Sequence, residues 1–221
     1  MTEDQVLERI REIGIVPVVR ALTPQQALGA AEAVSAGGIP IVEITMTVPG
    51  AVQVIAQLAR EGGKDLLIGA GTVLDKQAAR QCLDAGAQFI VSPGFDGETV
   101  ELVRRAGIVM MAAGLTPTEV ITAWKAGSAL VKVFPCGLVG GPKYIRALRG
   151  PLPQIPLVPT GGVNLENAGE FIRAGAAALG VGGELVAPDA LRVGDYQLIA
   201  QSAREFLARV EDARAQKQPA H

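Results

Sequence analysis

The sequence predicts an α/β chain built from eight strand–helix units, a TIM (β/α)8 barrel with an extra helix at its N-terminal end. Three observations predict this fold. Short apolar runs rich in β-branched residues recur eight times, helix-like segments separate them, and several of these segments stop at Ala-Gly just before the next apolar run. Parallel strands that are buried on both faces and joined by right-handed crossovers have this pattern.

The predicted strands are short and almost entirely apolar. They fall at residues 15–19, 41–44, 66–68, 89–91, 108–111, 130–133, 157–158 and 178–181. An open doubly wound sheet remains the structural alternative, because hydrophobic periodicity alone does not distinguish the two architectures.

The predicted helices carry start and stop signals. Thr23 precedes a proline, Asp75 precedes an amphipathic segment, and Thr116-Pro117-Thr118-Glu119 has the form of a capping box with proline in the first turn. Glycine suited to a left-handed C-cap ends the segments near residues 37, 86, 127 and 175. Two further helices are expected, at 3–13 before the first strand and at 194–214 after the last.

Length and composition favour one domain over residues 1–221, ending in a polar tail at about 212–221. Hydrophobic residues make up 49% of the chain, which is enough for a sizeable core. The formal net charge is −2 and no basic run is present. Nucleic acid and an anionic membrane are therefore not expected as partners, and a small solute is.

Cysteine and histidine usage restricts the chemistry further. Cys82 and Cys136 do not form a CxxC pair, as expected for a reducing compartment. The acidic start lacks the features of a signal peptide and no apolar run reaches membrane-spanning length, so we expect a cytoplasmic protein. The single histidine, His221, ends the polar tail, so neither a His-ligated zinc site nor a Ser-His-Asp triad is expected.

Lys132 most needs an explanation, because its ammonium group interrupts the apolar run Ala-Leu-Val-Lys-Val-Phe-Pro at 129–135. Burial disfavours the charged form of lysine and lowers its pKa, which makes the neutral amine available as a nucleophile toward carbonyl groups. The alternative is a lysine that snorkels or forms an ion pair at a strand end.

A carboxylate interrupts another predicted strand in the same way. Glu43 lies in Ile-Val-Glu-Ile-Thr and needs a partner in an apolar interior, for which Lys132 is the simplest candidate. One interpretation is a structural ion pair. We favour the other, a general acid/base beside an amine that forms a Schiff base, because TIM barrels build their active sites at the C-terminal ends of the strands.

Glycine-rich turns follow the last two predicted strands. Thr160-Gly161-Gly162 precedes Asn164, which we expect to cap a helix, and Gly182-Gly183 follows the last strand. Loops at these positions of a TIM barrel direct N–H groups toward an anion, so we expect a phosphate or carboxylate there.

Several motifs make this sequence resemble the KDPG/KHG aldolase family, the 2-dehydro-3-deoxy-6-phosphogluconate and 4-hydroxy-2-oxoglutarate aldolases. The resemblance spans residues 15–186 and rests on Val-Glu-Ile-Thr (42–45), Gly-Ala-Gly-Thr-Val (69–73), Phe-Ile-Val-Ser-Pro-Gly (89–94), Leu-Thr-Pro-Thr-Glu (115–119), Val-Lys-Val-Phe-Pro (131–135) and Pro-Thr-Gly-Gly-Val (159–163). It implies a class I aldolase on a TIM barrel, generally a homotrimer, that needs no metal and no cofactor.

The resemblance also implies roles for individual residues. Lys132 would form the Schiff base and Glu43 would be the general acid/base. Thr72 would hold the carboxylate of pyruvate. The full set of positions expected to contact substrate is Arg20, Thr45, Thr47, Thr72, Pro93, Phe134, Thr160, Gly161, Gly162, Gly182 and Gly183.

Two positions depart from the pattern of the family. Many members carry arginine where this chain has Thr47, so a cationic anchor is lost that Arg20 would partly replace. Where serine is common in the last loop, this chain has Gly183 followed by Glu184, whose carboxylate would repel a phosphate unless it points away.

The expected activity is reversible cleavage of 2-dehydro-3-deoxy-6-phosphogluconate to pyruvate and glyceraldehyde 3-phosphate, so the expected partners are 2-keto acids and aldehydes. Cleavage of 4-hydroxy-2-oxoglutarate to pyruvate and glyoxylate is a close second. The alternatives are an aldolase that prefers unphosphorylated 2-keto-3-deoxy acids, a phosphate-binding barrel isomerase in which Lys132 is only an electrostatic clamp, and a structural trimer with a vestigial site.

Overall fold

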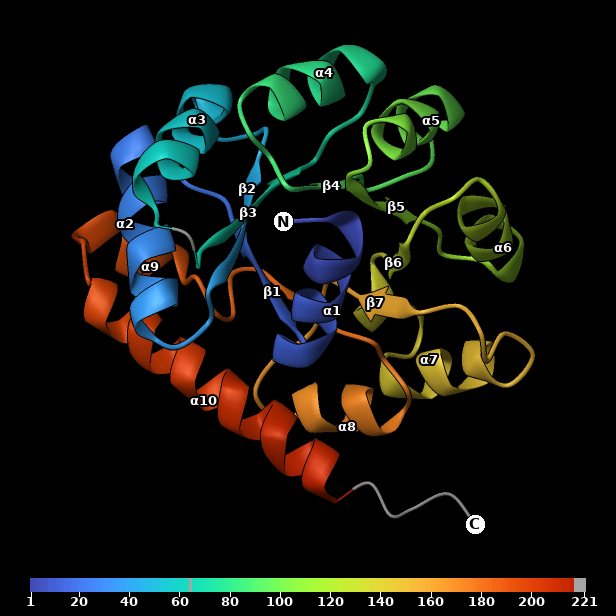
Figure 1. Ribbon diagram of the computed structural model, residues 1–221. Helices are drawn as coiled ribbons and strands as arrows, with labels where there is room; N and C mark the ends of the chain where they lie inside the picture. Colours follow the sequence, from blue (N-terminus) through green and yellow to red (C-terminus); the bar gives the residue numbers. More distant parts are fainter. Residues whose placement is uncertain (64, 217–221) are drawn as a thin grey trace.

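In the computed structural model, eight parallel strands form the wall of a barrel and helices surround it (Figure 1). The structure describes residues 1–63 and 65–216. The strands are β1 Ile15–Val19, β2 Ile41–Thr45, β3 Leu67–Gly71, β4 Phe89–Val91, β5 Val109–Ala113, β6 Leu130–Val133, β7 Leu157–Pro159 and β8 Leu179–Val181.

The sheet closes on itself. Each strand from β1 to β6 pairs with the next strand of the chain, and β8 pairs with β1, with Ile15 opposite Leu179. Directly after β7, Thr160 forms a parallel bridge with Gly180 of β8. This bridge brings the two ends of the sheet together, so the predicted TIM barrel is confirmed and the open doubly wound sheet is wrong.

Helices cover the outside of the barrel between successive strands. They are α2 Pro24–Ala36, α3 Ala51–Glu61, α4 Lys76–Asp84, α5 Gly97–Arg105, α6 Pro117–Lys125, α7 Pro142–Arg149, which a 3₁₀ turn η1 (Cys136–Val139) precedes, and α8 Ala168–Arg173. Two helices follow β8: the short α9 Pro188–Val193, which the sequence pattern did not indicate, and the long α10 Tyr196–Ala215. Helix α10 packs along α2 and α8.

The extra N-terminal helix is confirmed as α1 Glu3–Ile13. Figure 1 shows α1 lying across the mouth of the barrel that faces the viewer. Only Gly14 separates α1 from β1, so this mouth holds the N-terminal ends of the parallel strands. The C-terminal ends, where TIM barrels carry their active sites, open at the opposite mouth.

The predicted helix starts are confirmed by side-chain caps. The Thr23 hydroxyl accepts a hydrogen bond from the Gln26 amide at 3.2 Å, and Asp75 caps α4 in the same way. Thr116 and Glu119 form the expected capping box of α6. The glycines expected after four of the helices do have left-handed φ angles, at Gly38, Gly86, Gly127 and Gly175.

The third strand extends further than the sequence predicted. It runs through Gly71, so Gly69 and Gly71 both lie inside the strand. At both positions the side chain of another residue occupies the space where a Cβ atom would lie. A Cβ on Gly69 would lie 2.2 Å from the Phe89 ring, and one on Gly71 would lie 1.8 Å from Oε1 of Glu43.

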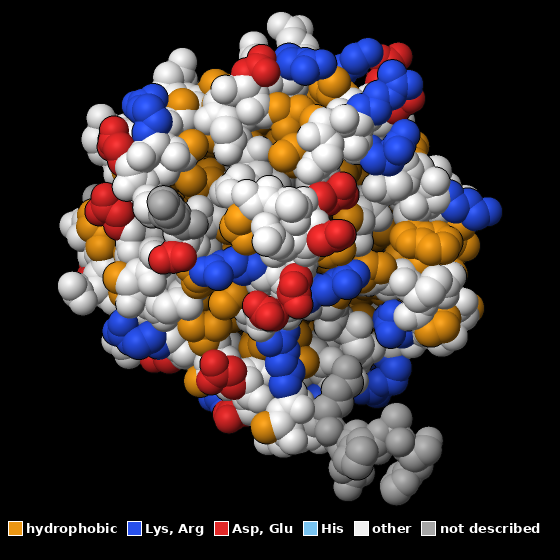
Figure 2. Space-filling model, viewed as in Figure 1, with side chains coloured by type: hydrophobic (Ala, Val, Ile, Leu, Met, Phe, Trp, Pro, Cys, Tyr) orange, Lys and Arg blue, Asp and Glu red, His pale blue; other side chains and the backbone are white. Residues whose placement is uncertain are grey.

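The end of the chain and the surface add three facts. Residues 212–215 of the predicted polar tail belong to α10, and its residues 217–221 lie outside the described part of the chain. Figure 2 shows basic and acidic side chains intermixed on the face that carries α1. Within residues 1–63 and 65–216, every helix is too short or too polar to cross a membrane.

Candidate active site

Lys132 and Glu43 lie on strands that stand opposite each other in the barrel. Lys132 pairs with Ala113 of β5 and Val158 of β7, whereas Glu43 pairs with Val18 of β1 and Gly69 of β3. Both residues are buried, with exposed fractions of 3% for Lys132 and 2% for Glu43. Because β2 and β6 are half a ring apart, side chains that reach the barrel axis from these strands meet near its centre.

The two side chains shift each other's proton affinity. Burial raises the pKa of the Glu43 carboxyl, and the charges of Lys132 and Arg20 partly oppose this rise. Burial also lowers the pKa of the Lys132 ammonium; Glu43 opposes the fall and Arg20 adds to it. In both groups burial favours the neutral form, which makes a free amine and a carboxylic acid more accessible at neutral pH.

The buried pair is not a closed structural ion pair. No salt bridge joins Lys132 to Glu43 in the described part of the chain, and Oε1 of Glu43 is buried without a hydrogen-bond partner. An unpartnered buried carboxyl oxygen is costly. The missing side chain of Gly71 gives this carboxyl its space. The Glu43 carboxyl is therefore free to exchange a proton with a substrate or water molecule that lies beside the Lys132 amine.

Phe134 covers the amine. The Nζ atom of Lys132 lies 5.2 Å from the centroid of the Phe134 ring. Phe134 follows the last residue of β6 and is two positions after Lys132, so in extended backbone the two side chains lie on the same side. Phe134, one of the positions expected to contact substrate, therefore packs beside Lys132. The ring shields the amine from water on this side.

Thr72, the first residue after β3, has a strained backbone conformation. Its φ angle is +58°, in the left-handed region that β-branched residues rarely adopt and that costs about 1–3 kcal/mol. Such strain is typical of residues whose position is needed for binding or catalysis. Pro93 follows the neighbouring strand β4, two residues after its last residue Val91, and both side chains are half-buried.

A second group of predicted residues surrounds a hollow of about 230 Å³ at the C-terminal ends of β7, β8 and β1. We call it the far-end hollow. It is lined by Arg20, Phe134, Thr160, Gly161, Gly162, Val163, Gly180, Gly182, Gly183 and Glu184. Phe134 thus touches both the buried amine and this hollow, so it joins the two parts of one site.

The far-end hollow presents hydrogen-bond donors. Gly161 and Gly162 adopt φ angles of 82° and 79°, which only glycine adopts easily. Within the described residues, the N–H groups of Gly161, Gly162 and Gly183 donate to no backbone acceptor. Together with the guanidinium of Arg20, these amides form a site suited to an anion.

The helix that follows this turn begins later than the sequence predicted. Helix α8 starts at Ala168 with Asn167 as its N-cap, so the prediction that Asn164 caps it is wrong. The Asn164 side chain instead accepts hydrogen bonds from the amides of Glu166 and Asn167 in an intervening turn, at 3.1 and 3.0 Å. These amides belong to the turn before α8, so the Asn164 side chain caps that turn and not the helix itself. The anion donors therefore come from the glycine turn.

Besides Thr72 and Pro93, the predicted binding residues Thr45 and Thr47 do not line the far-end hollow. The Thr45 hydroxyl is fully buried and donates to the carbonyl of Val19 at 3.0 Å, which ties β2 to β1. It also lies 2.7 Å from the hydroxyl of Thr47, an exposed residue. Both hydroxyl groups therefore have contacts with the protein itself at the end of β2.

Three residues of the far-end hollow lie outside the predicted set of substrate contacts: Glu184, which was noted only as a departure from the family pattern, and Val163 and Gly180. A Cβ on Gly180 would lie 2.1 Å from Oγ1 of Thr160, so this glycine lets the Thr160 side chain enter the hollow. A glycine inside an apolar strand is the signal that could have indicated it.

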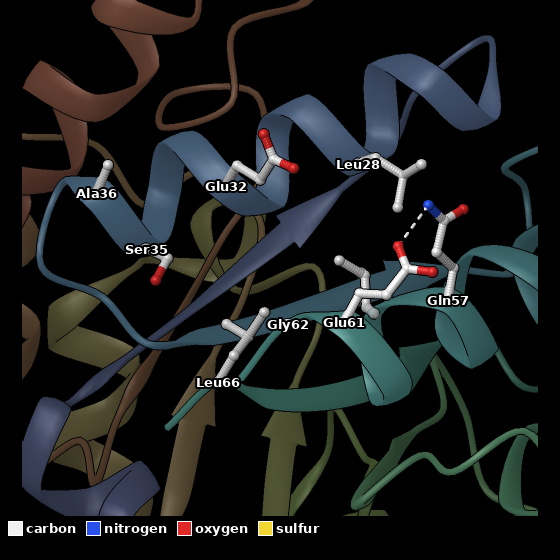
Figure 3. Close-up of a pocket in the computed structure, with 9 residues that line it drawn as sticks. Leu28, Glu32, Ser35, Ala36, Gln57, Glu61, Gly62 and Leu66 are labelled. Atoms are coloured by element: carbon white, nitrogen blue, oxygen red, sulfur yellow. Dashed lines mark hydrogen bonds between the residues drawn. The ribbon is translucent and has the colours of Figure 1, made fainter. Parts of the chain in front are cut away.

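A larger hollow, about 420 Å³, lies on the outer surface between α2 and α3 (Figure 3). Glu32 and Ser35 of α2 and Gln57 and Glu61 of α3 contribute its polar groups, and Nε2 of Gln57 donates to Oε2 of Glu61 at 2.9 Å. No residue from the C-terminal end of a strand reaches it. Catalysis in a TIM barrel occurs at those strand ends, so this hollow is separate from the candidate site.

A TIM barrel that buries an amine beside a carboxyl group, and opens toward an anion-binding rim, defines an enzyme site for a carbonyl substrate that carries a negative charge. The family model for KDPG and KHG aldolase matches residues 6–202. The chain belongs to this family of aldolases, and it is a lyase.

Individual relatives agree with this placement. The chain is 35% identical over 204 residues to the 2-dehydro-3-deoxy-phosphogluconate aldolase of Treponema pallidum, covering 92% of this chain and 95% of the relative. A KDPG aldolase of Legionella pneumophila, solved with pyruvate captured as a covalent carbinolamine, superposes with a TM-score of 0.84 at 29% identity, over 91% and 98% of the two chains. A designed protein cage made by fusing symmetric oligomeric domains gives a TM-score of 0.84 at 33% identity, over 93% and 74%.

Proposed function

We propose that this protein is a class I aldolase that reversibly cleaves 2-dehydro-3-deoxy-6-phosphogluconate to pyruvate and glyceraldehyde 3-phosphate. The observation that carries the proposal is the buried amine of Lys132 beside the unpartnered carboxyl of Glu43. The substrate named for the Treponema pallidum relative and the covalent pyruvate adduct of the Legionella pneumophila enzyme support it.

The reaction begins at the amine. Neutral Lys132 attacks the C2 ketone of the substrate, and the resulting carbinolamine loses water to give an iminium ion. Loss of that water needs a proton donor. Glu43, whose pKa burial raises, supplies the proton to the departing hydroxyl group.

Bond cleavage then uses the iminium ion as an electron sink. Glu43, acting through a water molecule, accepts the proton of the C4 hydroxyl group while the C3–C4 bond breaks and its electrons form an enamine. The aldehyde leaves. Protonation of the enamine at C3 and hydrolysis of the imine release pyruvate and restore the free amine.

The remaining residues bind the two ends of the substrate. Thr72 and Pro93 form the pyruvate end, with Thr72 holding the carboxylate and Phe134 excluding water from the amine. Arg20 and the N–H groups of the glycine turns hold the phosphate at the far-end hollow, where Thr160, Gly182 and Gly183 complete the wall. Thr45 and Thr47 shape the end of β2 beside Glu43.

The same catalytic pair would also cleave 4-hydroxy-2-oxoglutarate to pyruvate and glyoxylate, because only the aldehyde half differs. The joint description of the family as KDPG and KHG aldolase supports this second substrate. Comparison of kcat/KM for the two substrates measures how well 4-hydroxy-2-oxoglutarate is cleaved relative to 2-dehydro-3-deoxy-6-phosphogluconate.

We further propose that the protein is a homotrimer. Large apolar side chains are exposed around the C-terminal mouth, where Leu74 is 62%, Phe95 41% and Leu138 87% exposed. The symmetric oligomeric domains of the designed cage support an assembly of this kind. Light scattering after gel filtration gives the mass, and a monomer across the accessible concentration range contradicts the proposal.

Borohydride reduction in the presence of pyruvate tests the catalytic proposal. The expected result is a pyruvate-sized mass increase on Lys132, found by peptide mass spectrometry, and its absence after Lys132→Met substitution. If Lys132 gains no such mass while 2-dehydro-3-deoxy-6-phosphogluconate is still turned over, the Schiff-base mechanism is refuted and a non-covalent barrel enzyme is favoured.

A further inference from the structure

We propose that Glu184 is a specificity-determining residue, which weakens the binding of phosphorylated substrates relative to their unphosphorylated counterparts. This inference rests on the proposed function, because it concerns the far end of the same substrate. The far-end hollow contains an anionic side chain, that of Glu184, beside its anion donors.

The backbone that carries Glu184 is held in place. The amides of Leu185 and Val186 both donate to the carbonyl of Gly182, at 3.0 and 2.9 Å. From outside the turn, the Ser202 hydroxyl of α10 donates to the Glu184 carbonyl at 3.3 Å. The Cα atom of Glu184 is therefore held in place at the edge of the far-end hollow.

Glu184 lies on a ridge between two hollows. Glu184 lines the far-end hollow together with Arg20, and it also lines a separate hollow of about 260 Å³ against α10, which Ser202 and Glu205 share. Glu184 is exposed and makes no salt bridge within the described residues. Its negative charge is thus not neutralised by a cationic partner and is free to act on whatever occupies the far-end hollow.

The charges at the hollow nearly cancel for an incoming phosphate. Arg20 attracts the dianion, whereas Glu184 repels it, so the two side chains together add little attraction beyond that of the free amides. A neutral hydroxyl group at the same place has no such repulsion and can donate a hydrogen bond to the carboxylate. The chain therefore discriminates less strongly in favour of phosphate than Arg20 and the glycine turns alone would allow.

The test is the Glu184→Gln variant, which removes the charge and keeps the shape. We expect the ratio of kcat/KM for 2-dehydro-3-deoxy-6-phosphogluconate to that for unphosphorylated 2-dehydro-3-deoxygluconate to rise about tenfold, mainly through a lower KM for the phosphorylated acid. The rise should shrink at high salt, because the carboxylate is exposed. Inorganic phosphate should also become a stronger competitive inhibitor.

Glu205→Gln is the matched control. Glu205 lies in the outer hollow only, so this variant changes the net charge by the same amount without altering the far-end hollow, and its substrate ratio should equal that of the wild type. Glu184→Ser is a second test variant, with the same expected direction. An unchanged ratio in both Glu184 variants, or an equal rise in Glu205→Gln, overturns the inference.

The failure of this inference is distinguishable from failure of the proposed function. Borohydride trapping of pyruvate on Lys132 depends on the catalytic pair and not on the far-end hollow. Wild-type protein that is trapped normally, while Glu184→Gln leaves the substrate ratio unchanged, refutes only the role of Glu184. Wild-type protein that is not trapped refutes the Schiff-base proposal itself.

Discussion

The interior of the barrel and the far-end hollow deal with charge in opposite ways. Inside, Lys132 and Glu43 are nearly inaccessible to water, and burial shifts the pKa of each toward its neutral form. At the hollow, Arg20 and Glu184 are exposed, and the other binding groups are backbone amides of glycine turns.

This difference shows how one site separates chemistry from recognition. Proton transfer and nucleophilic attack need groups whose pKa is displaced, and displacement of this kind requires a dry environment. Recognition of an anion needs donors that keep their positions, and backbone amides provide these without burying a charge. Changes in the interior should therefore affect kcat most, and changes in the hollow should affect KM.

Replacement of Lys132 by methionine should have the largest effect. We expect kcat/KM to fall by at least about a thousandfold, because no other group replaces the amine. The melting temperature should not fall, since an apolar side chain of similar length replaces a buried cation. Lys125→Met, at an exposed lysine of α6, is the control and should retain full activity. Substantial residual cleavage in Lys132→Met would contradict the covalent mechanism.

Glu43→Gln should have the next largest effect. The amine remains but proton transfer is lost, so kcat should fall about 10²- to 10⁴-fold with a smaller change in KM. Glu43 also raises the pKa of Lys132, so its removal should lower that pKa further. Rapid-quench measurement of the trapped imine checks both points. If kcat is unchanged, Glu43 is a structural residue and the comparison between interior and rim fails.

Gly71→Ala perturbs the same carboxyl without removing it. A Cβ at Gly71 would lie 1.8 Å from Oε1 of Glu43, so the carboxyl must move. We expect kcat to fall about tenfold and the free energy of unfolding to fall by about 1–3 kcal/mol, measured by urea denaturation. Gly97→Ala is the control, because a Cβ there would have no contact closer than 3.9 Å. Equal losses in both variants would argue against a specific effect on Glu43.

Arg20→Gln should act mainly at the rim. The KM for the phosphorylated substrate should rise about tenfold, the effect of losing one charged hydrogen bond. The KM for pyruvate in the reverse reaction should change little. Arg20 lowers the pKa of Lys132 and that of Glu43, so its removal should also move the pH profile of kcat to higher pH. Arg105→Gln on α5 is the control, and a profile that stays in place would contradict the electrostatic link between the two regions.

The smallest effect concerns stability as a function of pH. The folded-state pKa of Glu43 is raised above its unfolded value of 4.5, so ionisation of this group destabilises the fold progressively as pH rises from about 4.5 through the folded pKa. Glu43→Gln has no such loss. Its free energy of unfolding relative to the wild type should therefore increase from pH 4 to pH 7. A constant difference over this range would show that the carboxyl is not perturbed.

The sequence by itself determined the order of strands and helices, the extra N-terminal helix and the two charged residues of the interior. The bridge between Thr160 and Gly180 decided that the sheet closes into a barrel. Strand runs, helix caps and glycine stops are local signals, and each acts through neighbours a few residues away. Lys132 and Glu43 were evident for a related reason. A charge in a fully apolar strand has no satisfactory surroundings unless the interior supplies them.

Only the tertiary structure decided which groups meet at the rim and how. The space that Gly71 leaves for Glu43, and that Gly180 leaves for Thr160, depends on contacts between different strands. The Thr45 hydroxyl is likewise directed to the carbonyl of Val19 on the neighbouring strand. These outcomes depend on distances between segments far apart in the chain, and no local pattern in the sequence contains those distances.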